Sequence, residues 1–393
     1  NYSILNCAFP YLNELLMAPW DKPEWYTKTE YLKDKNAFLT TKYSVAGKKE
    51  ERRYLTIVSS DKADCRELSL ERLTTATKNF SVIPDKIGGV TEDTLYAFKQ
   101  CASSLKKVTL SGCESYSFTQ TFSVTCDDKN IADDIKNSVK YFDLQAQKAE
   151  EKKLGKKYVE LFSVRTVKTG DNDFDRFVNG FLPLEMYWVS SLDRGWPTGM
   201  RGVRDAANDF EGMLCYNKDM CKGVIENIFS KQRSDGWYPR QVPFGSGTKF
   251  DLREFVDSAC FFTEYVYDYL SYTCDYSVLE KEYPYFDNET LESGLTHLKK
   301  GIDYLLSDDA LGVHGLVKMR GGDWLDCLSG VGKKGKGESV MVSCQLVTCL
   351  NLLVEILTEV GQADDVEKYE KSGIELKNAI NKAAFNGRFY NAV

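Results

Sequence analysis

Hydrophobic and polar positions alternate in the first third of the chain as they do in β-strands. Residues 37–45 and 53–58 are rich in β-branched and aromatic side chains, and residues 116–124 alternate with a period of two. Such patterns are typical of half-buried antiparallel strands. We predict a β-sandwich portion over residues 1–129, with a short helix between residues 64 and 80.

From residue 130 onward the period changes to that of helices. Ile131 and Ile135 lie on one stripe of a charged amphipathic pattern, so we predict a helical linker over residues 130–170. Asn288 is expected to be the N-cap of a later helix, because apolar residues follow it at helical spacing. Residues 171–393 are almost wholly helical in pattern. Helices are expected there at 172–191, 205–217, 219–232, 254–273, 288–306, 338–361 and 364–385.

Composition narrows the chemistry that the chain can perform. Of 393 residues, 51 are Lys or Arg and 58 are Asp or Glu, so the net charge of -7 does not favour nucleic acid or anionic membranes as partners. No apolar run approaches the roughly 18 residues of a membrane span. With His297 and His314 as the two histidines, His-rich metal sites and most Ser-His or Cys-His systems are nearly excluded. Catalysis, if present, would therefore depend on carboxylates.

The 12 cysteines are scattered singly, without a C-x-x-C pair. This distribution predicts reduced thiols in a cytoplasmic protein. The first residues, from Asn1 onward, contain neither an initiator Met nor a signal-sequence pattern, so we expect the chain to be cut from something longer.

Three segments could carry chemistry, and they lie in long connections between the predicted helices. The first, residues 193–211, includes Trp196, Arg201, Arg204 and Asp209. Two arginines at a helix start can bind phosphate, and an Arg-Asp pair can bind sugar hydroxyls. A charged helix N-terminus, in which the arginine and the acidic residues pair with one another, explains the composition equally well.

The second segment places Trp237 between Asp235 and Arg240, and Arg253 and Asp257 follow. Flat aromatic rings beside charged groups suit a carbohydrate, because the ring stacks on the apolar sugar face. An aromatic turn that covers the core is an equally good interpretation.

The third segment, residues 320–327, places Asp323 and Asp326 on either side of Trp324 in a Gly-rich loop. Desolvation in such a loop can raise the pKa of an Asp so that it serves as a general acid. The alternative is a capped turn with a solvated Asp.

Together these segments resemble glycoside hydrolase family 94, the inverting phosphorylases of cellobiose, chitobiose, cellodextrins and β-1,2-glucans. The family's Arg-Asp pair with a second Asp is similar to residues 204–209, and its Gly-Asp-Trp-Asn-Asp block is similar to residues 322–326. The Gly-Glu-Ser-Val that follows in the family matches residues 337–340. Order and spacing agree from about residue 172 to the end.

The resemblance implies a β-sandwich, a helical linker and an (α/α)6 catalytic barrel. It implies no metal or organic cofactor, and inorganic phosphate is a substrate. It implies that Asp326 protonates the glycosidic oxygen while phosphate attacks the anomeric carbon from the opposite face. Arg204 and Asp209 would bind the sugar that is cleaved off, and Arg201 or Arg204 would reach the phosphate. Asp323 and Trp324 would shape the same subsite, with Trp196, Trp237 and Asp257 as further substrate contacts.

Two departures from the family pattern qualify this picture. Asp257 is what survives of a Ser-Asp-Asp-Leu-Leu-Trp type segment, so the acceptor side is expected to differ. Together with the loop at residues 193–199, this resembles the β-1,2-oligoglucan phosphorylases more than the cellobiose enzymes. A barrel also needs six helix pairs, and the family's His and Thr-Gly phosphate residues lie downstream of Val393. We therefore expect an incomplete barrel, 171–393, whose remainder comes from another chain or is missing by truncation.

The expected activity is reversible phosphorolysis of a β-glucan to α-glucose 1-phosphate and a shortened glucan. Three alternatives remain open: a cellobiose or cellodextrin type of phosphorylase, an inverting β-glucan hydrolase with a second catalytic carboxylate, and a non-catalytic carbohydrate-binding subunit.

Overall fold

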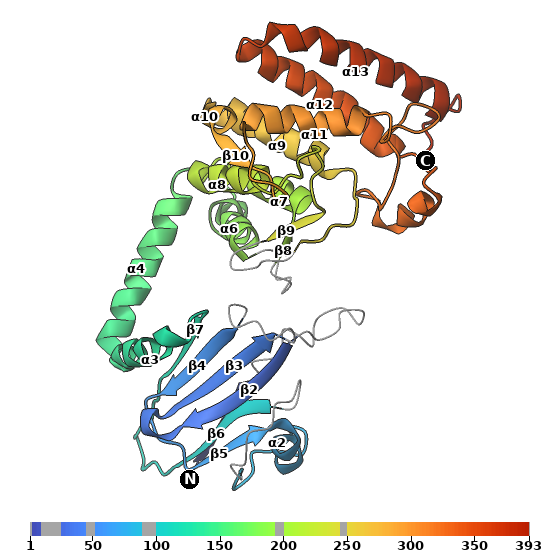
Figure 1. Cartoon of the computed structure of the whole chain (residues 1–393). Coiled ribbons are helices and arrows are strands. Elements are labelled where there is room, and N and C mark those ends of the chain that lie inside the picture. The colour runs from blue at the N-terminus through green and yellow to red at the C-terminus, as the bar shows by residue number, and fades with distance from the viewer. Residues whose placement is uncertain are drawn as a thin grey trace. The chain divides into compact units, whose positions relative to one another are not determined.

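The computed structural model describes residues 2–8, 25–44, 52–88, 100–192, 200–243 and 250–392. The chain divides into two compact units, residues 1–157 and 158–393, and each is described by itself (Figure 1). The protein is thus a multidomain chain of mixed helix and sheet.

Two antiparallel sheets form the centre of the first unit. One contains β1 (Tyr2–Ala8), β6 (Gln100–Val108) and β5 (Cys65–Ser69), and the other contains β2 (Trp25–Leu32), β3 (Ala37–Ser44), β4 (Arg53–Ser59) and β7 (Gln120–Thr125). Phe38 and Ile57 of the second sheet are buried against Leu68 and Ala102 of the first, so the two sheets pack face to face. The alternation that indicated strands thus records one buried face on each sheet.

The helix predicted over residues 64–80 is only partly right. Strand β5 takes its first part, and α2 spans Leu70–Ala76. Ser69 separates the two elements, because its hydroxyl accepts a hydrogen bond from the Arg72 N–H at 3.4 Å.

A single helix predicted after residue 130 is interrupted in the structure. The segments are the 3-10 turn η3 (Asp128–Asn130), α3 (Ile131–Val139), the 3-10 turn η4 (Lys140–Phe142) and α4 (Leu144–Phe162). Asp143 is extended at the interruption, and its carboxylate accepts the Ala146 N–H at 3.0 Å as the next helix begins.

The second unit is mainly helical. Its elements are α5 (Asn172–Arg176), the π-helical η5 (Phe177–Phe181), α6 (Leu182–Leu192), α7 (Val203–Glu211), α8 (Lys218–Phe229), α9 (Ser258–Thr273), α10 (Ser277–Glu280), α11 (Gly294–Leu306), the 3-10 segment η7 (Asp326–Lys334), α12 (Val340–Glu359) and α13 (Ala363–Ala384). Short strand pairs join β8 (Met200–Gly202) to β9 (Gln241–Pro243) and β10 (Glu282–Pro284) to β11 (Leu291–Ser293).

Helix α11 begins later than the sequence predicts. Leu291, which falls within the predicted range 288–306, lies in β11 and is exposed. The N-cap is Ser293 rather than Asn288, and its hydroxyl accepts the Thr296 N–H at 3.2 Å.

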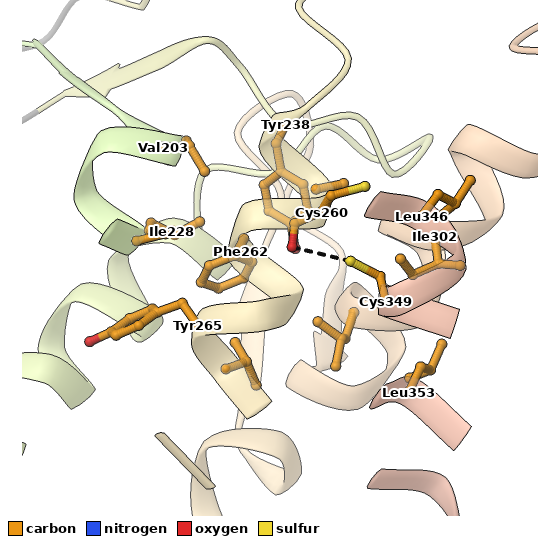
Figure 2. Close-up of a cluster of buried hydrophobic side chains, with 14 of the residues drawn as sticks. Val203, Ile228, Tyr238, Cys260, Phe262, Tyr265, Ile302, Leu346, Cys349 and Leu353 are labelled. Carbon is orange, nitrogen blue, oxygen red and sulfur yellow. Dashed lines mark hydrogen bonds between the residues drawn. The ribbon is translucent and has the colours of Figure 1, made fainter. Parts of the chain in front are cut away.

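Helix α9 lies at the centre of the helical core, where it contacts α7, α8, α11 and α12. Figure 2 shows Cys260 and Phe262 of α9 among buried side chains from the neighbouring helices. The Cys349 thiol of α12 donates a hydrogen bond to the Cys260 carbonyl at 3.4 Å. This packing fixes the N-terminus of α9, which carries part of the candidate site.

Helix α12 corrects the expectation that no segment approaches the length of a membrane span. By length and composition alone it is long and apolar enough to cross a membrane. Half of this apolar stretch is buried inside the protein, however, and α12 packs against α9, α11 and α13. The helix is apolar because about half of it lies in the core, and core helices of other proteins meet the same criterion.

Candidate active site

Residues 253–257 and 320–326, which we call the two site loops, are held together by backbone hydrogen bonds. The Gly321 N–H donates to the Glu254 carbonyl at 2.9 Å. Gly322 has a φ of 141°, a conformation that glycine adopts far more readily than other residues. The glycines therefore let the second loop lie directly against the first.

Asp323 holds the second site loop against the start of α12. It is buried, and its Oδ2 accepts a hydrogen bond from the Ser339 hydroxyl at 2.6 Å. Its Oδ1 accepts the Leu325 N–H at 2.8 Å. Asp323, predicted as a substrate contact, therefore shapes the loop from behind the surface.

Arg204, on α7, lies between two carboxylates from the two site loops. Its Nη1 donates to Asp257 Oδ2 and its Nη2 donates to Asp326 Oδ1, each at 2.8 Å. The Asp257 side chain is 0% exposed, whereas that of Asp326 is 62% exposed. Burial raises the pKa of Asp257, and Arg204 opposes that shift. Of the two carboxylates, Asp326 is therefore the one that a substrate can reach.

Two aromatic rings lie close to the Arg204 guanidinium. The guanidinium carbon lies 5.0 Å from the centroid of the Trp324 ring and 5.4 Å from that of Phe255. Phe261 packs against Trp324 with a centroid separation of 5.3 Å. Trp324 remains 44% exposed, so part of its ring is available to stack on a sugar beside Asp326.

Arg201 and Asp209 bind each other below the surface. The Arg201 Nη2 donates to Asp209 Oδ2 at 2.8 Å and to the Val189 carbonyl at 3.0 Å, and its Nη1 donates to the Ser190 carbonyl. Both side chains are buried. In this arrangement Arg204, rather than Arg201, is the predicted phosphate ligand that lies beside Asp326.

Trp237 supports the first site loop from the core side. Its ring is buried, and its Nε1 donates to the Phe255 carbonyl at 3.1 Å. This placement favours the aromatic turn over the core, the alternative that the sequence had left open. Trp196 lies outside the described residues.

Phe255 and Asp251 were missed as site residues by sequence reasoning. Arg240 and Arg253 lie 4.7 and 5.8 Å from the centroid of the Phe255 ring, and both donate to the Asp251 carboxylate. Together with Arg204, three arginines surround one ring. Asp251, Arg253 and Phe255 alternate along one short segment, but no local pattern shows that Arg204 and Arg240 meet them there.

A cavity of about 710 Å³ lies apart from these groups, along α12 and α13. Its lining includes Val347, Ile374 and Tyr390 but none of the residues around Arg204. Within the described part of the chain, no group of three or more His, Cys, Asp or Glu side chains is arranged to hold a metal ion.

Curated relatives match more than half of the chain. Solabiose phosphorylase of Paenibacillus borealis is 30% identical over 244 residues, which are 59% of this chain and 30% of that protein. Cellobionic acid phosphorylase of Neurospora crassa is 24% identical over 227 residues, 57% of this chain and 28% of that protein. Cyclic β-(1,2)-glucan synthase NdvB of Rhizobium meliloti is 24% identical over 257 residues, 59% of this chain and 9% of that protein. The chain thus spans less than a third of the length of these relatives.

The fold has a solved counterpart at low sequence identity. A candidate kojibiose phosphorylase from the human microbiome superposes with a TM-score of 0.54 at 10% identity, covering 99% of this chain and 51% of that one.

A protein-family model identifies the family of this chain. Residues 158–392, more than half of the chain, match the model described as "Glycosyl hydrolase 94 superfamily, catalytic domain". The carboxylates, the guanidinium and the half-exposed indole described above all lie within this range. The chain therefore belongs to the glycoside hydrolase 94 superfamily, to whose catalytic domain its second unit corresponds.

Proposed function

We propose that the protein catalyses the reversible, inverting phosphorolysis of a β-glucan oligosaccharide to α-glucose 1-phosphate and a shortened glucan. The observation that carries this proposal is the exposed Asp326 carboxylate, bonded to Arg204 beside the half-exposed Trp324 ring. This group lies within a catalytic domain whose named relatives include phosphorylases.

Asp326 acts as the general acid in the proposed reaction. It gives its proton to the glycosidic oxygen as the bond from that oxygen to the anomeric carbon breaks, and the bonding electrons leave with the oxygen. A phosphate oxygen forms the new bond from the opposite face of the sugar, so the β-linkage becomes an α-phosphate. Asp326 is left as a carboxylate, and the reverse reaction returns its proton.

The placement of Asp257 favours phosphorolysis over hydrolysis. An inverting hydrolase needs a second carboxylate that activates water on the far face of the sugar. Asp257 is the other carboxylate bonded to Arg204, and its side chain is fully buried. Phosphate is already an anion and needs no such base.

Arg204 is the proposed phosphate ligand and sugar ligand, and Trp324 is the proposed stacking platform. Arg201, Asp209, Asp323 and Trp237 would act behind the surface, through the contacts described above. Trp196 is proposed as a substrate contact from the sequence alone.

The preferred linkage is proposed to be β-1,2. NdvB, whose name refers to a cyclic β-(1,2)-glucan, supports this proposal, and so does the resemblance of residues 193–199 and Asp257 to the oligoglucan enzymes. Solabiose and cellobionic acid phosphorylases make other β-glucosides the alternatives to test.

We also propose that α6 to α13 form part of an (α/α)6 barrel whose other helices come from outside residues 158–392. The greater length of the relatives supports this proposal. The cytoplasm is the proposed location, because all 12 cysteines lie in described residues and are free thiols.

The decisive experiment measures glucose 1-phosphate released by the natural, full-length protein with any co-purifying chains. Substrates would be β-1,2-glucooligosaccharides, cellooligosaccharides, solabiose and cellobionic acid, each with and without phosphate. Phosphate-dependent release supports the proposal, and the fastest substrate identifies the linkage. Reducing sugar formed without phosphate would indicate a hydrolase, and no product on any substrate would indicate a binding subunit.

A further inference from the structure

Asp257 occupies a capping position without capping the helix. It is the N-cap residue of α9, where an Asp side chain ordinarily accepts a hydrogen bond from the first turn, but it makes no such bond. Its Oδ2 instead accepts the Arg204 Nη1 hydrogen at 2.8 Å. Its Oδ1 is buried and has no hydrogen-bond partner among the described residues. The side-chain bonding of this carboxylate is thus directed at Arg204.

Arg204 connects Asp257 to Asp326, so a change at Asp257 alters the position and the charge of the group that Asp326 contacts. A guanidinium is a rigid planar fork, so fixing one nitrogen orients the other. The other nitrogen is bonded to Asp326, and the Trp324 and Phe255 rings restrict the remaining motion. Because Asp257 is fully buried, it acts on a substrate only through this bridge.

We infer that Asp257 is a positioning residue which, by sharing Arg204, sets the pH range over which Asp326 can serve as a proton donor. The inference rests on the proposed function, in which Asp326 is the general acid. While Asp257 is ionised, it neutralises part of the Arg204 charge that Asp326 experiences. Arg253 also acts electrostatically on Asp326, and Asp323 acts on Asp257; neither is changed in the test.

This charge balance determines the direction in which Asp257→Asn should move the pH profile. In Asp257→Asn the Arg204 charge acts on Asp326 without compensation, which favours the carboxylate form of Asp326 over the protonated form that donates. We expect the alkaline limb of kcat/KM to move down by about one pH unit, which is about a tenfold loss on that limb. Activity on the acidic side should stay within about threefold of wild type, whereas a merely structural role would lower activity equally at every pH.

The test compares pH profiles of phosphorolysis by the full-length protein. Asp275→Asn is the matched control, since Asp275 lies just beyond the other end of α9 and bonds to Lys222 at 2.9 Å, away from the site loops. The alkaline limb of its kcat/KM profile should lie at the same pH as in the wild type. The double variant Arg204→Gln/Asp257→Asn leaves neither charge buried, which guards against misfolding of the single variant. Its limb should move up relative to Asp257→Asn, although its turnover is low.

A second measurement needs no turnover. The fluorescence of Trp324, obtained as the difference between each protein and its Trp324→Phe counterpart, should change with pH, because Arg204 contacts both Trp324 and Asp326. Its midpoint should fall by about one pH unit in Asp257→Asn. If phosphorolysis is absent but this midpoint shifts, the proposed function fails and the role of Asp257 stands. If both the limb and the midpoint are unchanged, the inference is overturned.

Discussion

Ser339 donates its hydroxyl hydrogen to Asp323 at 2.6 Å, so the residue that caps α12 also holds the loop that carries Asp326. The same hydroxyl oxygen accepts the Val342 N–H at 3.0 Å. Asp323 and Val342 are both buried, so water cannot replace either hydrogen bond at low cost. In this chain, the Gly-Glu-Ser-Val segment of the family pattern therefore joins the start of α12 to the second site loop.

Ser339→Ala should lower the free energy of unfolding by about 2 to 4 kcal/mol, because it removes a helix cap and leaves a buried carboxylate oxygen unpaired. Urea unfolding followed by far-UV circular dichroism measures this loss. Ser293→Ala is the matched control, since Ser293 caps α11 without bonding a carboxylate, and its expected loss is about 1 kcal/mol. Equal losses in the two variants would contradict the role given to the Asp323 contact.

Asp326→Asn should lower phosphorolysis by at least about 100-fold while leaving glucan binding within about tenfold. The amide keeps the shape of the side chain but has no acidic proton to give. Steady-state kinetics and calorimetric glucan titration measure the two effects. Asp303→Asn, which affects a surface contact with Lys368, should change neither, and near-normal turnover of Asp326→Asn would remove Asp326 from the acid role.

Trp324→Ala should weaken glucan binding by about five- to tenfold, because a stacked ring contributes roughly 1 kcal/mol beyond its contact area. Trp188 on α6 is a comparison of similar exposure, 41% against 44% for Trp324, and its replacement by Ala should leave binding unchanged. Titration calorimetry with the best glucan measures both variants. Equal affinities for the two would exclude Trp324 as the stacking platform.

The stability contributed by Asp275 should disappear in acid. Hydrogen bonds from Ser277 and Lys222 hold the pKa of Asp275 below its usual range, and the Tyr269 hydroxyl adds to them. A lowered pKa in the folded state stabilises the protein above the unfolded value of about 3.9, and this stabilisation is lost as the pH falls through the folded value.

The gap in unfolding free energy between wild type and Asp275→Asn should therefore be constant above about pH 5, begin to narrow below about pH 4, and continue to narrow as the pH falls toward the lowered pKa of the folded state. Chemical unfolding at a series of pH values measures it. A gap that stays constant into acid would show that the carboxylate charge is not what stabilises this corner of α9.

Parts of the fold were predictable because one buried face imposes a regular period. Strands β3 and β4 begin where the pattern places them, and α13 differs from its predicted range by one residue at each end. Starts of elements were predicted less well where a side chain decides between strand and helix. Ser69 and Ser293 each end a strand and cap a helix, and neither signal is visible in the hydrophobic period.

The site shows the same division. Motif spacing pointed to Arg204, Trp324 and Asp326, and the structure brings these three together. Motif spacing could not show that the side chains of Asp257 and Asp323 turn inward. Whether a carboxylate faces solvent or a buried guanidinium depends on how two distant loops pack.

The sequence by itself therefore determined the strand and helix periods, the family and the residue types of a carboxylate-dependent site, because these depend on local spacing and order. Tertiary structure alone decided which charges meet. Arg204 has several acidic residues nearby in sequence, yet it binds Asp257 and Asp326, because α9 and the Gly-rich loop place those carboxylates at the two nitrogens of its fork. Burial then separates their tasks, leaving Asp326 open to solvent and Asp257 closed to it.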